Sequence, residues 1–306
     1  MNYYPNRKNH TPLATAEEGA YTHYRSKVEG VQDRVHGPKF KEHYNQATLF
    51  YNSLSDVEKK HFVSAVQFEL GKCDEAEVQQ RIIDKYNIID HDLAVQIGSA
   101  FGGLTVPDEV RKNHGQKSEF LSQVTGTNQV FTAKGRQVGI YILPGFNSAV
   151  VTELKTAFTA AGIIPMIVGP VKGSVTSGGV TFQTQFTFET CRSTHFDGLI
   201  FVGPQDETNT EYTETLRKQG RIKHAAIEGF FHQKPLLAHG KCIPWMADLA
   251  LPGEFSPSVK TGEEIQTEKG VIFVPSAGFG VEMIKQWTDL LAKHRVWDRE
   301  VEHIAA

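Results

Sequence analysis

Cysteine and long apolar runs are both scarce in this sequence. Only Cys73, Cys191 and Cys242 occur in 306 residues, and such a small, odd set predicts free thiols rather than a disulfide framework. No stretch approaches the roughly 18 consecutive apolar residues of a membrane-spanning helix, so we expect no membrane partner. Residues 1–7 lack the apolar centre of a signal peptide. The sequence predicts no particular localisation.

An excess of positive charge is missing as well. The formal net charge is −3 at pH 7, and a nucleic-acid binder would show a basic patch or stripe, so we expect no nucleic-acid partner. Hydrophobic residues make up 40% of the chain and charged residues 22%, the balance of a globular protein. Because 306 residues exceed the roughly 100–200 typical of one domain, we expect more than one unit.

The N-terminal part of the chain changes from an irregular to a helical pattern. Residues 1–35 are polar and aperiodic, and we expect an extended arm that lies along another surface. Residues 36–103 show helical periodicity. Ser55-Asp56-Val57-Glu58 is a capping box, residues 74–77 repeat the start signal, and Asp90 opens a third helix that should run to Gly102. Such a short helical segment is expected to pack on something else.

The C-terminal part alternates strands and helices. Residues 104–134 form the predicted linker, and residues 135–306 the predicted second domain. Apolar strands are expected at 137–143, 163–168, 197–203, 235–238 and 271–274, with a hairpin at 174–185. The last helix should bury Val281, Ile284, Trp287 and Leu291. This alternation predicts an α/β fold with an open, doubly wound, mostly parallel sheet.

One segment carries a specific resemblance to a known family. The run from Lys39 to Ser55, KFKEHYNQATLFYNSLS, together with residues 58–61 and 68–73, resembles the C-terminal helical region of large-subunit haem catalases. Residues 2–7, NYYPNR, resemble the arm that precedes those helices. The resemblance implies a flavodoxin-like domain after the helices, and it implies that this chain is the C-terminal part of such a catalase.

The second half also resembles, more weakly, another superfamily. The strand and helix order, residues 161–163 and residues 236–242 are similar to the intracellular-protease and stress-chaperone branch of the class I glutamine amidotransferase-like proteins. That resemblance implies a nucleophile on a sharp turn after a strand. Counted along the superfamily pattern, the nucleophile position falls on Lys241, with Cys242 one residue later, and the supporting acid falls on Val150.

The catalase resemblance implies a haem enzyme that this chain does not complete. Large-subunit catalases are tetramers that convert hydrogen peroxide to water and oxygen, with haem iron bound by a tyrosinate in an Arg-x-x-x-Tyr setting. No arginine here has tyrosine four residues later, and the distal-like spacing from Arg7 to His10 is followed by Thr11-Pro12-Leu13. We therefore expect haem in the parent protein, upstream of residue 1, and no cofactor and no catalytic residue in this chain.

Other ligand motifs are weak. His232, His239 and Cys242 do not have the paired spacing of metal ligands, and we expect no metal. The turn at residues 144–148 contains one glycine, which is too few for a dinucleotide fingerprint or a flavin phosphate loop. His239, Lys241 and Cys242 are interpreted as a vestigial elbow.

Two functional hypotheses of different classes follow. In the first, the chain supports stability and self-association, in a homotetramer in the parent catalase, and binds unfolded proteins as an ATP-independent chaperone (holdase). In the second, it is a small cysteine-dependent hydrolase or glyoxal-consuming enzyme that uses Cys242. An activated thiolate would react well below the ordinary thiol pKa of about 8.5, and this separates the two.

Overall fold

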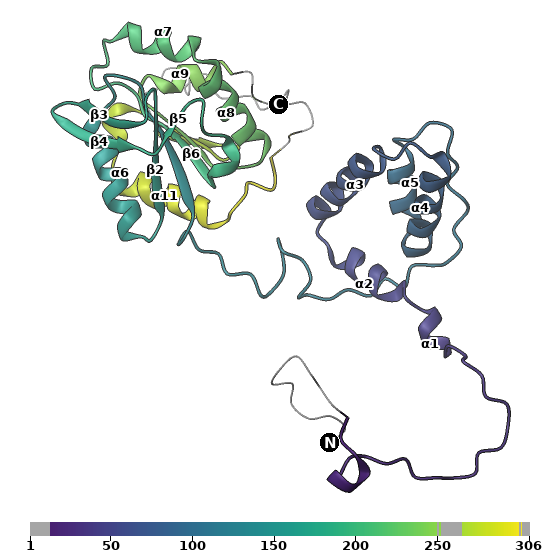
Figure 1. Cartoon of the computed structure of the whole chain (residues 1–306). Coiled ribbons are helices and arrows are strands. Elements are labelled where there is room, and N and C mark those ends of the chain that lie inside the picture. The colour runs from purple at the N-terminus through teal and green to yellow at the C-terminus, as the bar shows by residue number, and fades with distance from the viewer. Residues whose placement is uncertain (1–12, 250, 252–264, 300, 302–306) are drawn as a thin grey trace. The chain divides into compact units, whose positions relative to one another are not determined.

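The chain forms two compact units. A computed structural model describes residues 13–249, 251, 265–299 and 301. A helical unit comprises the chain up to Ser53 and from Phe62 to Ser118, and an α/β unit comprises Leu54–His61 and the chain from Glu119 onward (Figure 1). The predicted domain boundaries at residues 35, 103 and 134 remain predictions.

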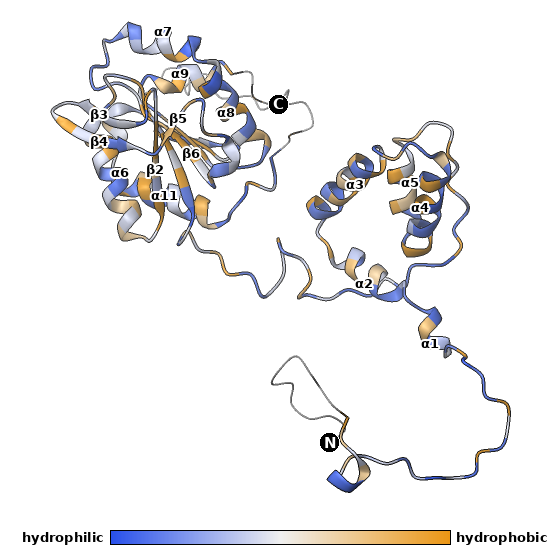
Figure 2. Ribbon diagram, in the orientation of Figure 1, coloured by the Kyte–Doolittle hydropathy of each residue, from blue (hydrophilic) through white to orange (hydrophobic). Residues whose placement is uncertain are grey.

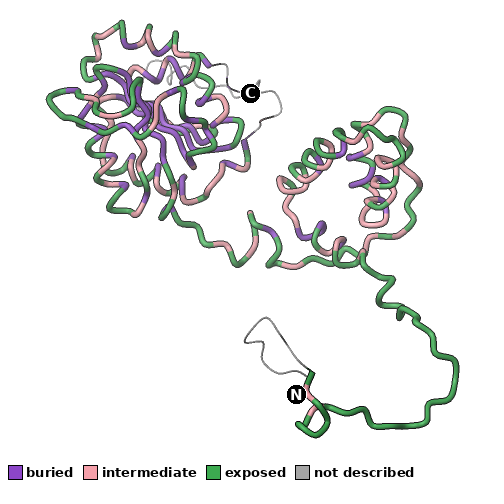
Figure 3. Tube along the Cα trace, in the orientation of Figure 1, coloured by how far each residue is buried: buried purple, intermediate pink, exposed green. Residues whose placement is uncertain are grey.

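The helical unit consists of short helices that follow an exposed arm. Residues 13–35 are exposed almost throughout (Figure 3). The side chains of Tyr24 and Val31, for example, are 89% and 97% exposed. The small core is made by Ile83, Leu93, Ala94 and Ile97. The elements are η1 (Ala16–Glu18), α1 (Pro38–Lys41), α2 (Asn45–Ser53), α3 (Asp56–Leu70), α4 (Ala76–Ile89) and α5 (His91–Gly98). Helix α3 belongs to this unit from Phe62 onward.

Two of the three predicted helix starts have side-chain caps. The Glu58 carboxylate accepts from the Ser55 amide at 2.8 Å, and the Glu58 amide donates back to Ser55 Oγ at 3.4 Å. Asp90 caps α5 by accepting from the Leu93 amide at 2.8 Å. At α4 the residue before the helix, Glu75, makes no side-chain cap. The capping-box and Asp90 predictions are confirmed.

The third helix is shorter than predicted. Helix α5 ends at Gly98, and Phe101 and Gly102 lie in the turn beyond it. A Cβ at residue 98 would lie 2.8 Å from a methyl group of Val106, so the chain has folded back tightly against the helix end. The helix therefore ends where a later part of the chain packs against it, before it reaches Gly102 and Gly103.

The predicted linker contains no helix or strand between residues 104 and 134, but it is held by side chains. Asn87 donates to the carbonyl of Asp108 at 2.9 Å, and Asn113 donates to Asp90 at 2.6 Å. Farther along, the Glu58 carboxylate accepts from Ser122 Oγ and from the Gln123 amide, both at 2.7 Å. The segment is therefore a set of anchored turns rather than a free tether.

The α/β unit is built on a seven-stranded sheet. Its order is β5-β2-β1-β6-β7-β9-β8, in which only β8 pairs antiparallel. A separate hairpin, β3–β4, lies outside that sheet. The strands are β1 (Gln137–Tyr141), β2 (Ile164–Gly169), β3 (Gly173–Ser177), β4 (Val180–Thr184), β5 (Phe186–Thr187), β6 (Gly198–Phe201), β7 (Leu236–His239), β8 (Gln266–Glu268) and β9 (Val271–Val274).

Helices cover both faces of this sheet. Figure 1 shows α6 and α11 on one side and α7, α8 and α9 on the other. Strands β6, β7 and β9 are buried at every position, as central parallel strands require (Figures 2 and 3). The helices are α6 (Ser148–Ala160), α7 (Thr210–Lys218), α8 (Gly220–Phe231), α9 (Cys242–Ala247) and α11 (Val281–Ala292), with short turns η2 (Ser193–His195) and η3 (Ser276–Gly278).

The predicted fold class is confirmed, with one local correction. The doubly wound sheet and the hairpin lie where the sequence places them. Val281, however, was predicted to face the core and is 81% exposed, whereas Met283 is 1% exposed. Val281 is the first residue of α11, where the helix has not yet reached the sheet. Trp287 and Leu291 are fully buried, as predicted.

Removing the Glu58 carboxylate should loosen residues 119–129. We expect Glu58→Gln to lower the free energy of unfolding by about 1–2 kcal/mol, because the carboxylate caps α3 and receives four donors. Those hydrogen bonds lower the pKa of Glu58, although burial opposes them. A lowered folded pKa gives stability that is present above the unfolded value of about 4.3 and is lost as pH falls below it.

The measurement is urea unfolding at pH 7 and pH 3, combined with amide exchange over residues 119–129. Glu69→Gln is the matched control, because Glu69 pairs only with exposed Lys72. Equal losses for both variants, or an unchanged difference at pH 3, would contradict this role for Glu58.

Candidate functional site

The turn after β7 is the best candidate for a catalytic elbow. Strand β7 ends at His239, helix α9 begins at Cys242, and Gly240 between them has φ +54°. This is the left-handed conformation that favours glycine. Lys241, where the sequence placed the nucleophile, has ordinary right-handed angles (φ −64°, ψ −8°). The sharp point of the turn therefore lies one residue earlier, at a position with no side chain.

Two polar side chains converge on Gly240. Ser276 Oγ, from the turn after β9, donates to the carboxylate of Glu207, from the loop after β6. A Cβ at residue 240 would lie 2.6 Å from Ser276 Oγ and 2.7 Å from a Glu207 oxygen. The pair thus occupies the space that an elbow side chain would need. No local sequence signal points to Glu207, because the pairing arises only when the ends of two strands meet.

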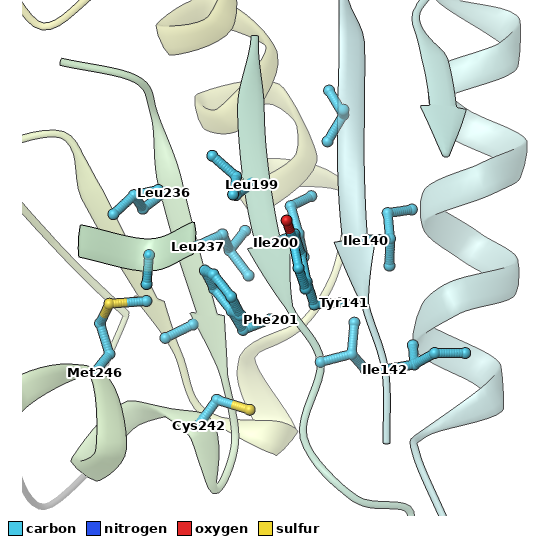
Figure 4. Close-up of a cluster of buried hydrophobic side chains, with 14 of the residues drawn as sticks. Ile140, Tyr141, Ile142, Leu199, Ile200, Phe201, Leu236, Leu237, Cys242 and Met246 are labelled. Carbon is cyan, nitrogen blue, oxygen red and sulfur yellow. The ribbon is translucent and has the colours of Figure 1, made fainter. Parts of the chain in front are cut away.

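Cys242 faces the core rather than the elbow. Its side chain is 1% exposed and lies with Leu143, Phe201 and Tyr212 around a pocket that has no room for water (Figure 4). Burial raises the pKa of the Cys242 thiol far above its ordinary value, and the charge of Glu207 adds to the effect. A thiol in this setting stays protonated, so it is a poor nucleophile. Lys241, predicted to be solvated, is half-buried.

His239 is buried and neutral. It is 0% exposed, and burial lowers its pKa to about 4. Nδ1 accepts from the Gly203 amide at 3.3 Å, which leaves the proton on Nε2. Nε2 has no partner among the described residues, and the ring packs edge-on against Phe279 at 5.8 Å. The histidine therefore stabilises the loop after β6 and does not reach a nucleophile.

The other natural ligand position of this fold is filled. Ligands of open α/β sheets bind where the strand order reverses, here beyond the ends of β1 and β6. Phe146 forms a bridge with Pro204 across that point and packs edge-on against Phe182 of the hairpin, with ring centroids 5.5 Å apart. The hairpin tip closes the site: Ser177 donates to the Phe146 carbonyl at 2.6 Å, and a Cβ at Gly178 would lie 2.6 Å from Ser148 Oγ.

The buried tyrosines do not suit haem iron. A tyrosinate ligand needs a lowered pKa, whereas burial raises the pKa of Tyr51 to about 12 and raises the pKa values of Tyr141 and Tyr212 well above the ordinary value. The Tyr212 hydroxyl also donates to the Val202 carbonyl at 2.5 Å. The residues described in this chain do not fit the haem-binding pattern.

The described residues form neither a metal centre nor a membrane-spanning helix. Within the described ranges, no three His, Cys, Asp or Glu side chains gather closely enough to hold a metal ion. Helices of the described part of the chain are all too short or too polar to cross a membrane.

Comparison with known proteins agrees with this architecture of a helical segment followed by a doubly wound domain. Residues 37–101 match the family described as catalase-related immune-responsive, and residues 134–301 match the C-terminal domain found in long catalases. Catalase-1 of Neurospora crassa is 34% identical over 99% of this chain, which spans 42% of that protein. Catalase-2 of Bacillus subtilis is 30% identical over 94% of the chain, or 38% of that catalase.

The chain belongs to the long-catalase family and contains that family's C-terminal domain. It spans about two fifths of the length of the curated catalases it matches. The predicted membership in the large-subunit catalases is therefore confirmed.

Placing a side chain at the elbow should destabilise the α/β unit. We expect Gly240→Ala to lower the free energy of unfolding by about 2–4 kcal/mol, since alanine resists the left-handed conformation and its Cβ would collide with the Glu207–Ser276 pair. Gly220→Ala is the control, because its added Cβ would meet nothing within 4 Å. Urea unfolding decides the matter, and equal stabilities would contradict the geometry.

Proposed function

We propose that this chain is the C-terminal part of a hydrogen-peroxide-decomposing haem catalase and serves stability and self-association rather than chemistry. One observation carries the proposal: almost the whole chain aligns with named catalases, yet it contains no Arg-x-x-x-Tyr pattern. The buried tyrosines and the side-chain-free elbow support a structural role. The homotetramer of the parent follows from the family resemblance, and haem belongs to that parent in this proposal.

The chain alone should neither bind stoichiometric haem nor release oxygen from peroxide. Haemin titration followed by the Soret band, with an oxygen electrode, provides the measurement. We expect only weak, non-saturating absorbance changes, of the kind that apolar surface gives with free haemin. A one-to-one complex that evolves oxygen would overturn the proposal.

A holdase activity is the second candidate, and an apolar groove supports it. A pocket of about 460 Å³ opens between α3 and α4 in the helical unit. Phe68 and Phe40 are also 66% and 65% exposed. Exposed apolar surface of this kind binds other apolar surfaces. The groove is lined by Phe62, Ala65, Val66, Glu69, Leu70, Cys73, Val78, Ile82 and Tyr86.

If the groove binds unfolded protein, Val66→Asp should weaken protection of a heat-labile enzyme several-fold in a light-scattering assay without ATP. A charge in the groove disfavours apolar contact. Val95→Asp is the matched control, because Val95 is 45% exposed on α5 and lies outside the groove. Absence of protection by the unmodified chain, or equal protection by both variants, would sink the holdase proposal.

The cysteine-dependent alternative has less support. A hydrolase or glyoxal-consuming enzyme would need Cys242 as an accessible thiolate, whereas the thiol is 1% exposed and has a raised pKa. Val150 occupies the position of the supporting acid. Its side chain is 5% exposed and has no group that can bind a proton. If Cys242 has a structural role, it should react with an alkylating reagent only after the chain unfolds.

A further inference from the structure

Charged residues gather where three neighbouring parallel strands begin, on the edge of the sheet opposite Gly240. Arg136 directly precedes β1, and Asp197 directly precedes β6. Lys234 lies two residues before β7, and the register that pairs Leu199 with Leu236 sets Lys234 beside Asp197. The register that pairs Val138 with Gly198 brings Arg136 to the same edge.

The chain after α11 adds two more cations to this edge. The Val296 amide donates to the Gln233 carbonyl at 2.8 Å, which fixes Arg295 near Lys234. Gln233, which precedes Lys234, has φ +56°, and His294, which precedes Arg295, has φ +70°. Arg299 is 4% exposed and donates to the carbonyls of Phe230 at 2.9 Å and Lys234 at 3.0 Å.

Negative charge at this edge is sparse. Asp197 accepts from Arg136 at 3.3 Å and from the Gln137 amide at 2.9 Å, and it lies 3.9 Å from His294. A carboxylate oxygen of Glu228 lies 3.6 Å from Nδ1 of His224. Among the described residues, no carboxylate makes an ion pair with Lys234, Arg295 or Arg299. Among the described residues, the charges of Asp197 and Glu228 both act on Lys234, and that of Asp197 acts on Arg295.

Lys234 is a buried cation that makes no ion pair with a described carboxylate. It is 3% exposed, and its Nζ donates to the carbonyl of Ser193. Burial, and then the charge of Arg295, lower its pKa to about 8. Burying an ammonium group without an anion costs several kcal/mol. Ser193 Oγ, in the residue that receives Lys234, is itself fully buried and has no partner among the described residues.

We propose that Lys234, Arg295, Arg136 and Ser193 bind a phosphate-class oxyanion at this edge of the α/β unit. A compact oxyanion accepts from two or three cations at once and supplies a counter-charge that none of the described residues gives to Lys234 or Arg295 as an ion pair. The outer side of the cluster is open, since the side chains of Arg136 and His294 are 28% and 39% exposed. The site is separate from the elbow, which lies at the other end of the strands.

The test is calorimetric titration of the whole chain with inorganic phosphate at pH 7, with ionic strength held constant by sodium chloride. We expect saturable binding at millimolar phosphate and a rise in Tm that chloride does not give. Arg295→Gln should weaken binding at least tenfold. Lys234→Met should abolish it while raising Tm without phosphate, because a buried charge has been removed.

Arg217→Gln is the control, because Arg217 is exposed and pairs with Asp248 elsewhere on the unit; its phosphate affinity should be unchanged. Glucose 6-phosphate identifies the source: tighter binding than inorganic phosphate indicates a phosphorylated metabolite, and equal or weaker binding indicates the free ion. Either result supports the site. No saturable binding, equal binding of succinate, or binding unchanged in Arg295→Gln would overturn the proposal.

Discussion

The parallel sheet of the α/β unit must be covered on both faces, and the other features of that unit follow from this requirement. Strands β6, β7 and β9 expose nothing, so polar groups are confined to the two edges where the strands begin and end. At the far ends, the Glu207–Ser276 pair and the hairpin fill the positions where this fold ordinarily holds ligands. At the starting ends, Arg136 pairs with Asp197, whereas Lys234, Arg295 and Arg299 make no ion pair with a described carboxylate.

Much of the fold could be predicted because its signals are local or periodic. Buried parallel strands are continuous apolar runs, and the capping box at Ser55 specifies a helix start through residues three apart. The early end of α5 could not be predicted, because it depends on Val106 packing against Gly98 from a later part of the chain. The prediction that Val281 is buried was wrong for a related reason. The helical periodicity continues to the start of the helix, which the core does not reach.

The candidate site was only partly predictable. The segment of residues 236–242 was recognised, but its register depends on backbone angles, and these place the sharp turn at Gly240 rather than Lys241. Glu207 and Ser276 lie 69 residues apart and meet only in the folded sheet. The cation cluster has the same origin, since strand register brings Asp197 and Lys234 together. The resemblance to large-subunit catalases was correct because it depends on whole segments.

The burial of Cys242 has a consequence for the chemical durability of the chain. Peroxide oxidises the thiolate form of cysteine far faster than the thiol, so a raised pKa slows the first step of the oxidation ladder toward sulfonic acid. Burial raises the pKa of both Cys242 and Cys191. Both sulfurs should therefore be oxidised more slowly than an exposed thiol would be. The α/β unit contains no other cysteine, so it offers peroxide no exposed cysteine to attack.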